Sequence, residues 1–288
     1  MTISIFANFL IDDEQRFLRL KESFYSFYKC NIQFWLVNIR GKYAKEVENF
    51  LIEHVNQDKL KIFFLHSKKG WFYDSRIMIN YISTDYVFVW NEDHKNTLSY
   101  ESFDTIIEEI KDNKIDNFTY SLFYNGDLYK SLLIDEAIEK KNIIYIDNNI
   151  NLHQKRLNLI KEKKILGQEY IISLISICST SLFKKIINSN DPPIKRWSKQ
   201  KPFDFEKAPN DIHWLPFRFG VPNKEFFKCI DKEWDADGNR INYIPIKEKN
   251  WIKIFYKMFY IIFKFFFKKL IIFFREIVNN FISRKLKK

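Results

Sequence analysis

Residues 91–94 carry the side chains of this sequence that are best suited to chemistry. Asn91, Glu92, Asp93 and His94 directly follow the apolar run 86–90. Such a run is typical of a buried central strand, and open α/β sheets bind ligands just past the carboxyl ends of their strands. Oxygen-bearing side chains there suit a hard divalent cation together with a phosphate-bearing substrate. The alternative is an ordinary exposed acidic turn.

A second candidate segment runs from His66 to Arg76. Gly70 permits a tight turn, and the backbone amides at the start of the following helix could face an anion. Asp74 either caps that helix or contacts the ligand. Arg76 either meets a phosphate or pairs with a surface acid.

The third candidate segment covers residues 196–207, where acids alternate with aromatic rings. Asp204 and Glu206 are candidates for a general base, with the neighbouring rings packed in the core or forming a platform for a sugar. The alternative is a solvated pair of acids beside packed aromatics.

The histidines and cysteines show no metal-binding spacing. The five histidines form no HxxxH pair and have no nearby cysteine, which predicts that the chain has no zinc site. The three cysteines form no disulfide framework, as expected in a reducing cytoplasm. Asp12, Asp13 and Glu14 close to the first residue argue against a secretory signal.

The elements that must position these residues alternate between strands and helices. The pattern predicts strands over residues 3–6, 32–37, 60–65 and 86–90, and helices over 12–28, 43–55 and 75–82. This alternation predicts βαβ units and a mainly parallel sheet. Further along, we expect a helix over 100–111, strands over 118–124, 143–146 and 170–177, a helix over 182–187, and a loop-rich stretch over 194–245.

The net charge of +11 is concentrated at the end of the chain. Residues 251–288 hold ten Lys or Arg and one Glu, which leaves 37 basic and 35 acidic residues in the remainder. The main body is therefore nearly neutral, which argues against nucleic-acid binding.

The same terminal stretch is amphipathic if it is helical. At about 100° per residue, the lysines gather on one arc and the phenylalanines lie on the opposite side. No apolar run approaches the ~18 residues that span a bilayer, and a basic face opposite an aromatic face is typical of a helix lying in the membrane interface. The alternative is a helix packed on a partner or on the body. The residues expected to bind anionic lipid are Lys253, Lys257, Phe259, Phe263, Lys264, Phe266 and Lys268.

With these motifs the chain resembles the GT-A glycosyltransferases, in particular small bacterial enzymes of family 2, over residues 1–245. In that fold the fourth strand ends in an Asp-x-Asp motif that binds Mn²⁺ or Mg²⁺ and the donor diphosphate. Asp93 matches the second acid, whereas Asn91 replaces the first. The turn and helix from Gly70 to Arg76 resemble the family's donor-contacting segment. Pro202-Phe203-Asp204-Phe205-Glu206 is similar to a Pro-aromatic-x-Phe-Glu element of related transferases.

The resemblance implies a Rossmann-like α/β domain over residues 1–245, followed by a membrane-associating helical tail over 246–288. It implies transfer of a sugar from a nucleotide-sugar to a glycan or glycolipid acceptor at the cytoplasmic face of the cell membrane. The donor would contact Gly70, Asp74, Arg76, Asn91, Glu92 and Asp93, with the metal on Asp93 and Glu92 and the base at Asp204 or Glu206. A nucleotidyl- or phosphotransferase and a non-catalytic membrane-peripheral scaffold remain alternatives.

Overall fold

The computed structural model describes residues 2–67, 70–121, 136–162, 171–189 and 214–230. The chain divides into two compact units, Met1–Asn239 and Arg240–Lys288. All described residues belong to the first unit, so the predicted tail lies outside them, and its boundary at residue 246 stays a prediction.

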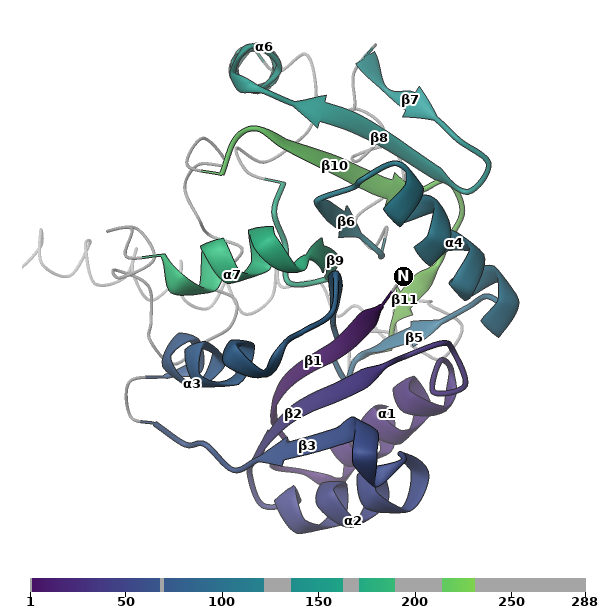
Figure 1. Ribbon diagram of the computed structural model, residues 1–288, viewed down its shortest axis with the longest axis vertical. Helices are drawn as coiled ribbons and strands as arrows, with labels where there is room; N and C mark the ends of the chain where they lie inside the picture. The colour runs from purple at the N-terminus through teal and green to yellow at the C-terminus, as the bar shows by residue number, and fades with distance from the viewer. Residues whose placement is uncertain (1, 68–69, 122–135, 163–170, 190–213, 231–288) are drawn as a thin grey trace, which may run out of the picture. The chain divides into compact units, whose positions relative to one another are not determined.

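The first unit is built on a nine-stranded sheet with helices on both faces (Figure 1). The order of its strands is β3-β2-β1-β4-β9-β6-β10-β8-β7. The pairings make seven strands run in one direction, while β9 and β8 run in the other. The predicted mostly parallel sheet flanked by helices is therefore confirmed. The sheet strands are β1 (Ile3–Leu10), β2 (Phe34–Arg40), β3 (Leu60–Phe63), β4 (Tyr86–Val89), β6 (Asn117–Thr119), β7 (Ile138–Glu139), β8 (Ile143–Asn148), β9 (Ser176–Ser179) and β10 (Phe217–Pro222).

The two faces of the sheet are covered by different helices. One hydrophobic cluster joins the sheet to helices α1, α2 and α4, and the other joins it to α3, α6 and α7. Side chains of a strand alternate between the two faces of the sheet. In β1, Ile3, Ile5 and Phe9 belong to the first cluster and Phe6 belongs to the second. The helices are α1 (Glu14–Tyr25), α2 (Ala44–His54), α3 (Trp71–Met78), α4 (Tyr100–Asp112), α6 (Ile150–Lys161) and α7 (Thr180–Asn188), with short 3-10 turns η1 (Gln57–Lys59) and η2 (Ile79–Tyr81).

A second, two-stranded sheet lies beside the carboxyl end of β4. Strand β5 (His94–Asn96) pairs antiparallel with β11 (Phe227–Cys229). Both strands differ from the sequence-based expectation, because residues 94–96 read as a polar loop and β11 falls in the stretch predicted to be loop-rich. Strand β10 also falls in that stretch, and helix α6 was not predicted.

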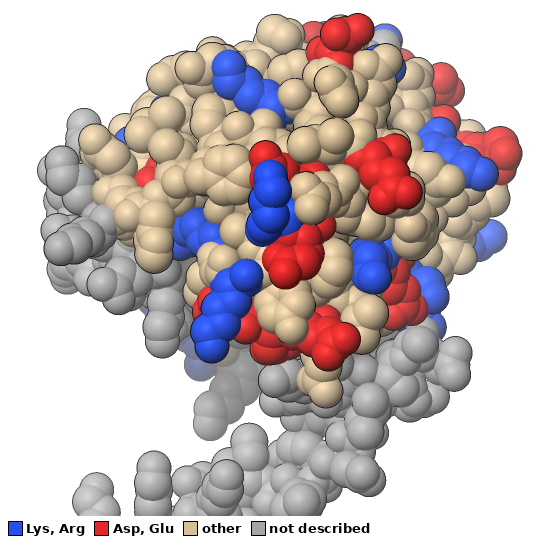
Figure 2. All heavy atoms as spheres, turned by 90° about the horizontal axis from the view of Figure 1, so that it is seen from below, with Lys and Arg blue, Asp and Glu red and all other residues tan. Residues whose placement is uncertain are grey.

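The charged side chains of the described surface are mixed in sign. In the view from below, Lys and Arg side chains lie among Asp and Glu side chains (Figure 2). Within the part of the chain described, no helix is long and apolar enough to cross a bilayer.

Candidate functional site

The candidate site lies at the carboxyl edge of the parallel strands. Strand β1 is flanked by β2 on one side and β4 on the other, so the chain order reverses there, and open α/β sheets bind ligands at such switch points. Asn8 of β1 and Asn38 of β2 are register partners at this edge, and the motif 91–94 directly follows β4. The predicted location of the motif is thus reproduced by the fold.

Asn8 and Asn38 hold the neighbouring loop against this edge. The Asn38 amide donates to Asn8 Oδ1 (2.8 Å) and to the Leu65 carbonyl (3.0 Å), and the Leu65 amide donates back to Asn38 Oδ1 (2.7 Å). The Asn8 amide donates to the Trp71 carbonyl (3.3 Å) at the start of α3. The two asparagines therefore position the loop that follows β3.

Gly70 and Asp74 shape the turn that enters α3. Gly70 has φ +93°, a conformation that favours glycine, and immediately precedes α3. Asp74 is 1 % exposed and accepts from the Ser67 amide, so it stabilises the loop from inside rather than pointing into solvent. Burial raises the pKa of Asp74, while the Ser67 amide, Arg40 and His66 oppose that rise.

Arg40, the last residue of β2, contributes positive charge at the same edge. Burial lowers the pKa of its guanidinium, and the nearby Asp74 opposes that shift. Its Nε atom is buried and has no hydrogen-bond partner among the described residues. Arg40 therefore retains an N–H group that could donate a hydrogen bond to a phosphate oxygen.

Arg76 lies further along α3 and is engaged elsewhere. Its Nε donates to the Ile187 carbonyl (2.8 Å), and its Nη2 donates to the Ser189 carbonyl (2.8 Å), at the end of α7. These two bonds direct the guanidinium toward α7, so the predicted role of Arg76 gains no support from the geometry.

Asn91 and Glu92 have structural partners inside the protein. Asn91 donates to the Tyr120 hydroxyl (3.1 Å) and to the Leu174 carbonyl (3.3 Å). The Glu92 carboxylate, 11 % exposed, pairs with the Arg16 guanidinium, whose Nε lies 2.8 Å from Oε1. Burial and then the charge of Asp93 raise the pKa of Glu92, and Arg16 opposes the rise.

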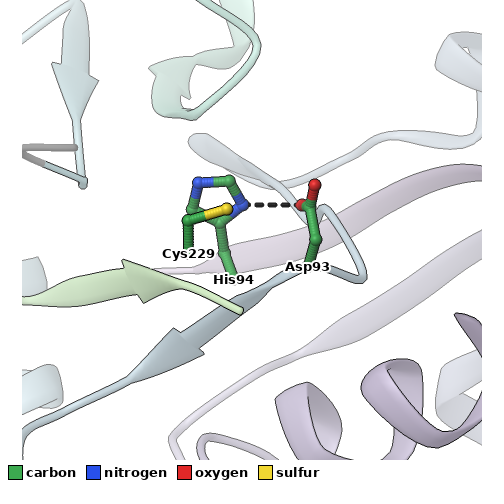
Figure 3. A group of neighbouring side chains, drawn as sticks. All are labelled: Asp93, His94 and Cys229. Carbon is green, nitrogen blue, oxygen red and sulfur yellow. Dashed lines mark hydrogen bonds and ion pairs between the residues drawn. The ribbon is translucent and has the colours of Figure 1, made fainter. Parts of the chain in front are cut away.

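Asp93, His94 and Cys229 converge beside the paired strands β5 and β11 (Figure 3). The Asp93 Oδ1 and His94 Nδ1 atoms are 2.7 Å apart, and the ligand atoms of all three residues lie within 4.8 Å of one another. Burial disfavours the Asp93 carboxylate, but the His94 imidazole and its hydrogen bond lower the pKa of Asp93 below the ordinary value. This grouping corrects the expectation that no cysteine approaches a histidine.

The oxygen-rich cation site implied by the resemblance does not fit these residues. Mn²⁺ and Mg²⁺ favour near-octahedral shells of oxygen ligands. Glu92, predicted as the second metal ligand, pairs with Arg16 instead, and the groups gathered around Asp93 offer a nitrogen and a sulfur atom. The predicted base residues Asp204 and Glu206 lie outside the described residues, and so do all the predicted lipid contacts.

Sequence reasoning did not assign site roles to Arg16, Arg40 and Cys229. The fold class could have indicated Arg16 and Arg40 as site residues. Arg16 lies in the first turn of α1, which follows β1, and Arg40 is the last residue of β2. Cys229 gave no such signal, because its meeting with His94 depends on the pairing of strands far apart in the sequence.

Comparisons with known proteins give a structural likeness alone. No protein-family model and no curated protein matches the chain. Residues 1–349 of TarS from S. aureus match with a TM-score of 0.50 and 12% identity, over 79% of this chain and 60% of that one. TarS with UDP-GlcNAc matches with a TM-score of 0.48 and 12% identity, over 84% and 62%. HddC from Yersinia pseudotuberculosis matches with a TM-score of 0.42 and 16% identity, over 80% and 94%.

The first of these matches is the one that bears on the fold. This chain spans 60% of the length of TarS 1–349, and at 12% identity the likeness establishes fold and not activity. The large, mostly parallel sheet with helices on both faces agrees with that likeness. The chain has the GT-A fold.

Proposed function

We propose that this protein transfers a glycosyl group from a nucleotide-sugar to an acceptor hydroxyl. The observation that carries the proposal is that Arg40 ends β2 and Asp93 follows β4, so both lie at the switch-point edge of a GT-A fold. The likeness to TarS 1–349, a glycosyltransferase, supports the same reaction class.

The charges at this edge suit a departing nucleoside diphosphate. Breaking the bond between the sugar and the diphosphate leaves negative charge on phosphate oxygens, and fixed positive groups lower the barrier to that step. Arg40 offers a buried donor without a partner among the described residues, and Arg16 lies nearby with its charge balanced by Glu92. Arg40 is therefore the residue we assign to the diphosphate.

The acceptor hydroxyl must lose a proton as the new bond forms. In an inverting reaction a carboxylate takes that proton, and Asp204 or Glu206 is our candidate for this base. We further propose that the acceptor is lipid-linked and that the basic, aromatic residues 246–288 hold the protein at the cytoplasmic face of the cell membrane.

The test is release of nucleoside diphosphate from a panel of nucleotide-sugars, with donor binding followed by thermal shift. Arg40→Met should lower turnover by about 10²-fold, the effect of removing one pre-positioned charge donor. Asp93→Asn should weaken donor binding. The matched control is Asp112→Asn, the same chemical change at an exposed carboxylate at the end of α4, which should leave both measurements unchanged.

Two other outcomes would overturn the proposal. Release of pyrophosphate from a nucleoside triphosphate, without diphosphate release from any nucleotide-sugar, would identify a nucleotidyltransferase that uses the same edge. Failure of every donor to bind, with Asp93→Asn leaving the cellular phenotype unchanged, would favour a non-catalytic scaffold.

A further inference from the structure

We propose that Asp93, His94 and Cys229 bind a borderline divalent metal of the zinc type, in place of Mn²⁺ or Mg²⁺. Soft thiolate and borderline imidazole ligands select Zn²⁺ and similar transition metals, whereas Mn²⁺ and Mg²⁺ prefer sites made of oxygen. Among the described residues, these three form the cluster whose ligand atoms lie close enough to share one ion.

The strand register explains why His94 and Cys229 meet. They are directly opposite partners in the antiparallel pair β5–β11, so their side chains project from the same face of the ribbon. The end of this ribbon is held by the Ile230 amide, which donates to the Asp93 carbonyl (2.7 Å). The pairing therefore brings together ligands that are far apart in the sequence.

The backbone around His94 is fixed by buried hydrogen bonds. The Ser23 hydroxyl donates to the His94 carbonyl and accepts from the Trp90 indole (2.9 Å). The Tyr120 ring packs edge-on against the imidazole, with ring centres 5.9 Å apart. His94 and Cys229 are therefore held on paired strands, while Asp93 lies in the turn just before β5.

The ligand atoms of the three residues would have to move closer together to share one ion. Tetrahedral zinc with its usual bond lengths places neighbouring ligand atoms about 3.5 Å apart. The observed limit of 4.8 Å exceeds that value by about 1.3 Å. Three protein ligands leave one position open, the arrangement of zinc sites that also bind a substrate or water.

The two ring nitrogens of His94 differ in their surroundings. The residue is 4 % exposed, and Nδ1 contacts Asp93 (Figure 3), whereas Nε2 has no hydrogen-bond partner among the described residues. An ion shared with Asp93 would therefore be bound through Nδ1, with the ring proton on Nε2. When the metal binds, the Cys229 S–H bond breaks and releases its proton to solvent, the metal–sulfur bond forms, and no electron is transferred.

The experiment uses the full chain stripped of metal with a chelator and then titrated with Co²⁺. Tetrahedral Co²⁺ bound to a thiolate shows a sulfur-to-metal charge-transfer band, and Zn²⁺ should displace it. The band should persist in the double variant Cys30→Ser/Cys178→Ser, in which Cys229 is the single remaining cysteine of the three. Cys229→Ser should lose the band and bind Zn²⁺ at least about tenfold more weakly.

The double variant keeps the test decisive if Cys229→Ser fails to fold. Absence of the band from both the wild type and the double variant would overturn the proposal, as would Co²⁺ or Mn²⁺ binding that is unchanged in Cys229→Ser. The inference rests on the same site as the proposed function, but metal binding is measured without a nucleotide-sugar. A negative result here would therefore leave the diphosphate-release test standing.

Discussion

The Arg16 guanidinium compensates the negative charge of the buried Glu92 carboxylate at the edge of the sheet. Glu92 is 8 % exposed, and both burial and the charge of Asp93 disfavour its ionised form. The Arg16 guanidinium supplies the compensating charge from the first turn of α1. Breaking such a pair by removing one partner is costly because the other charge stays buried.

We expect Arg16→Met to lower the free energy of unfolding by about 1–3 kcal/mol, below the range for a fully buried pair because Arg16 is partly exposed. Lys45→Met, at the exposed pair with Glu48, should cost less than about 0.5 kcal/mol. Urea unfolding at neutral pH compares the two variants. Equal losses would contradict the role given to Arg16, and adding Glu92→Leu to Arg16→Met should recover part of the loss.

Tyr86, at the start of β4, gives a pH-dependent prediction. Burial, followed by the charges of Asp116 and Asp85, raises the pKa of Tyr86 to about 12 from its ordinary value of 10.0. Between these values the unfolded chain loses the phenolic proton while the folded chain keeps it. Ionisation therefore favours the unfolded state, and stability falls as pH rises through this window.

The wild type should lose about 1 kcal/mol relative to Tyr86→Phe between about pH 9 and about pH 11. Urea unfolding of both proteins at several pH values measures the difference, because other titrating groups contribute equally to both. Parallel pH profiles would show that the Tyr86 hydroxyl has the same pKa in both states.

At the scale of elements, the turn between β2 and α2 fixes the edge that carries Arg40. Gly41 has φ +101°, and an added Cβ would contact the carbonyl group of Ile11, with its carbon at 2.6 Å, and Asp12 Oδ1 at 2.8 Å. The turn is also tied to the end of β1, since the Tyr43 amide donates to the Ile11 carbonyl (3.0 Å). A side chain at Gly41 would therefore push apart the ends of β1 and β2.

We expect Gly41→Ala to lower the free energy of unfolding by more than about 2 kcal/mol, because backbone strain and overpacking add. Gly220→Ala is the comparison, since its Cβ would meet the side chains of Phe118 (3.1 Å) and Ile115 (3.2 Å), which can shift. That variant should cost about 1–2 kcal/mol. A smaller loss for Gly41→Ala than for Gly220→Ala in urea unfolding would contradict this account of the turn.

The elements also show where sequence reasoning succeeds and where it stops. The strands and helices up to the end of β4 at Val89 follow from local periodicity, and with them the location of residues 91–94 at a strand end. Helix α3 begins at Trp71 rather than residue 75, because Gly70 provides the turn that starts it. Strands β5, β10 and β11 depend on partners distant in the chain, so local patterns did not reveal them or the contact of Cys229 with His94.

At the scale of the whole molecule, charge is divided between a nearly neutral body and a basic end. The described surface mixes charges of both signs on the face seen in Figure 2, whereas residues 251–288 hold ten basic residues and one acid. Basic residues near an anionic membrane each contribute about 1 kcal/mol of attraction, and apolar rings add burial in the interface. Membrane binding by the terminal residues should therefore have separable electrostatic and hydrophobic parts.

Sedimentation with vesicles of phosphatidylglycerol and phosphatidylcholine separates these parts. The full chain should sediment with the vesicles, and a chain lacking residues 251–288 should stay in the supernatant. Replacing four lysines by Gln should weaken binding by about 10²–10³-fold at low salt and reduce its salt dependence, since about four charges no longer attract the lipid. The lysines are Lys253, Lys257, Lys264 and Lys268.

Replacing the rings by Ser should weaken binding at every salt concentration, because burial of apolar area is not screened. The rings are Phe259, Phe263 and Phe266. Vesicles of phosphatidylcholine alone should bind the wild type more weakly than anionic vesicles bind the lysine variant, because that variant keeps six basic residues in 251–288. If the shortened chain sediments as fully as the wild type, the terminal residues do not hold the protein at the membrane. Their apolar face would then be assigned to packing against protein.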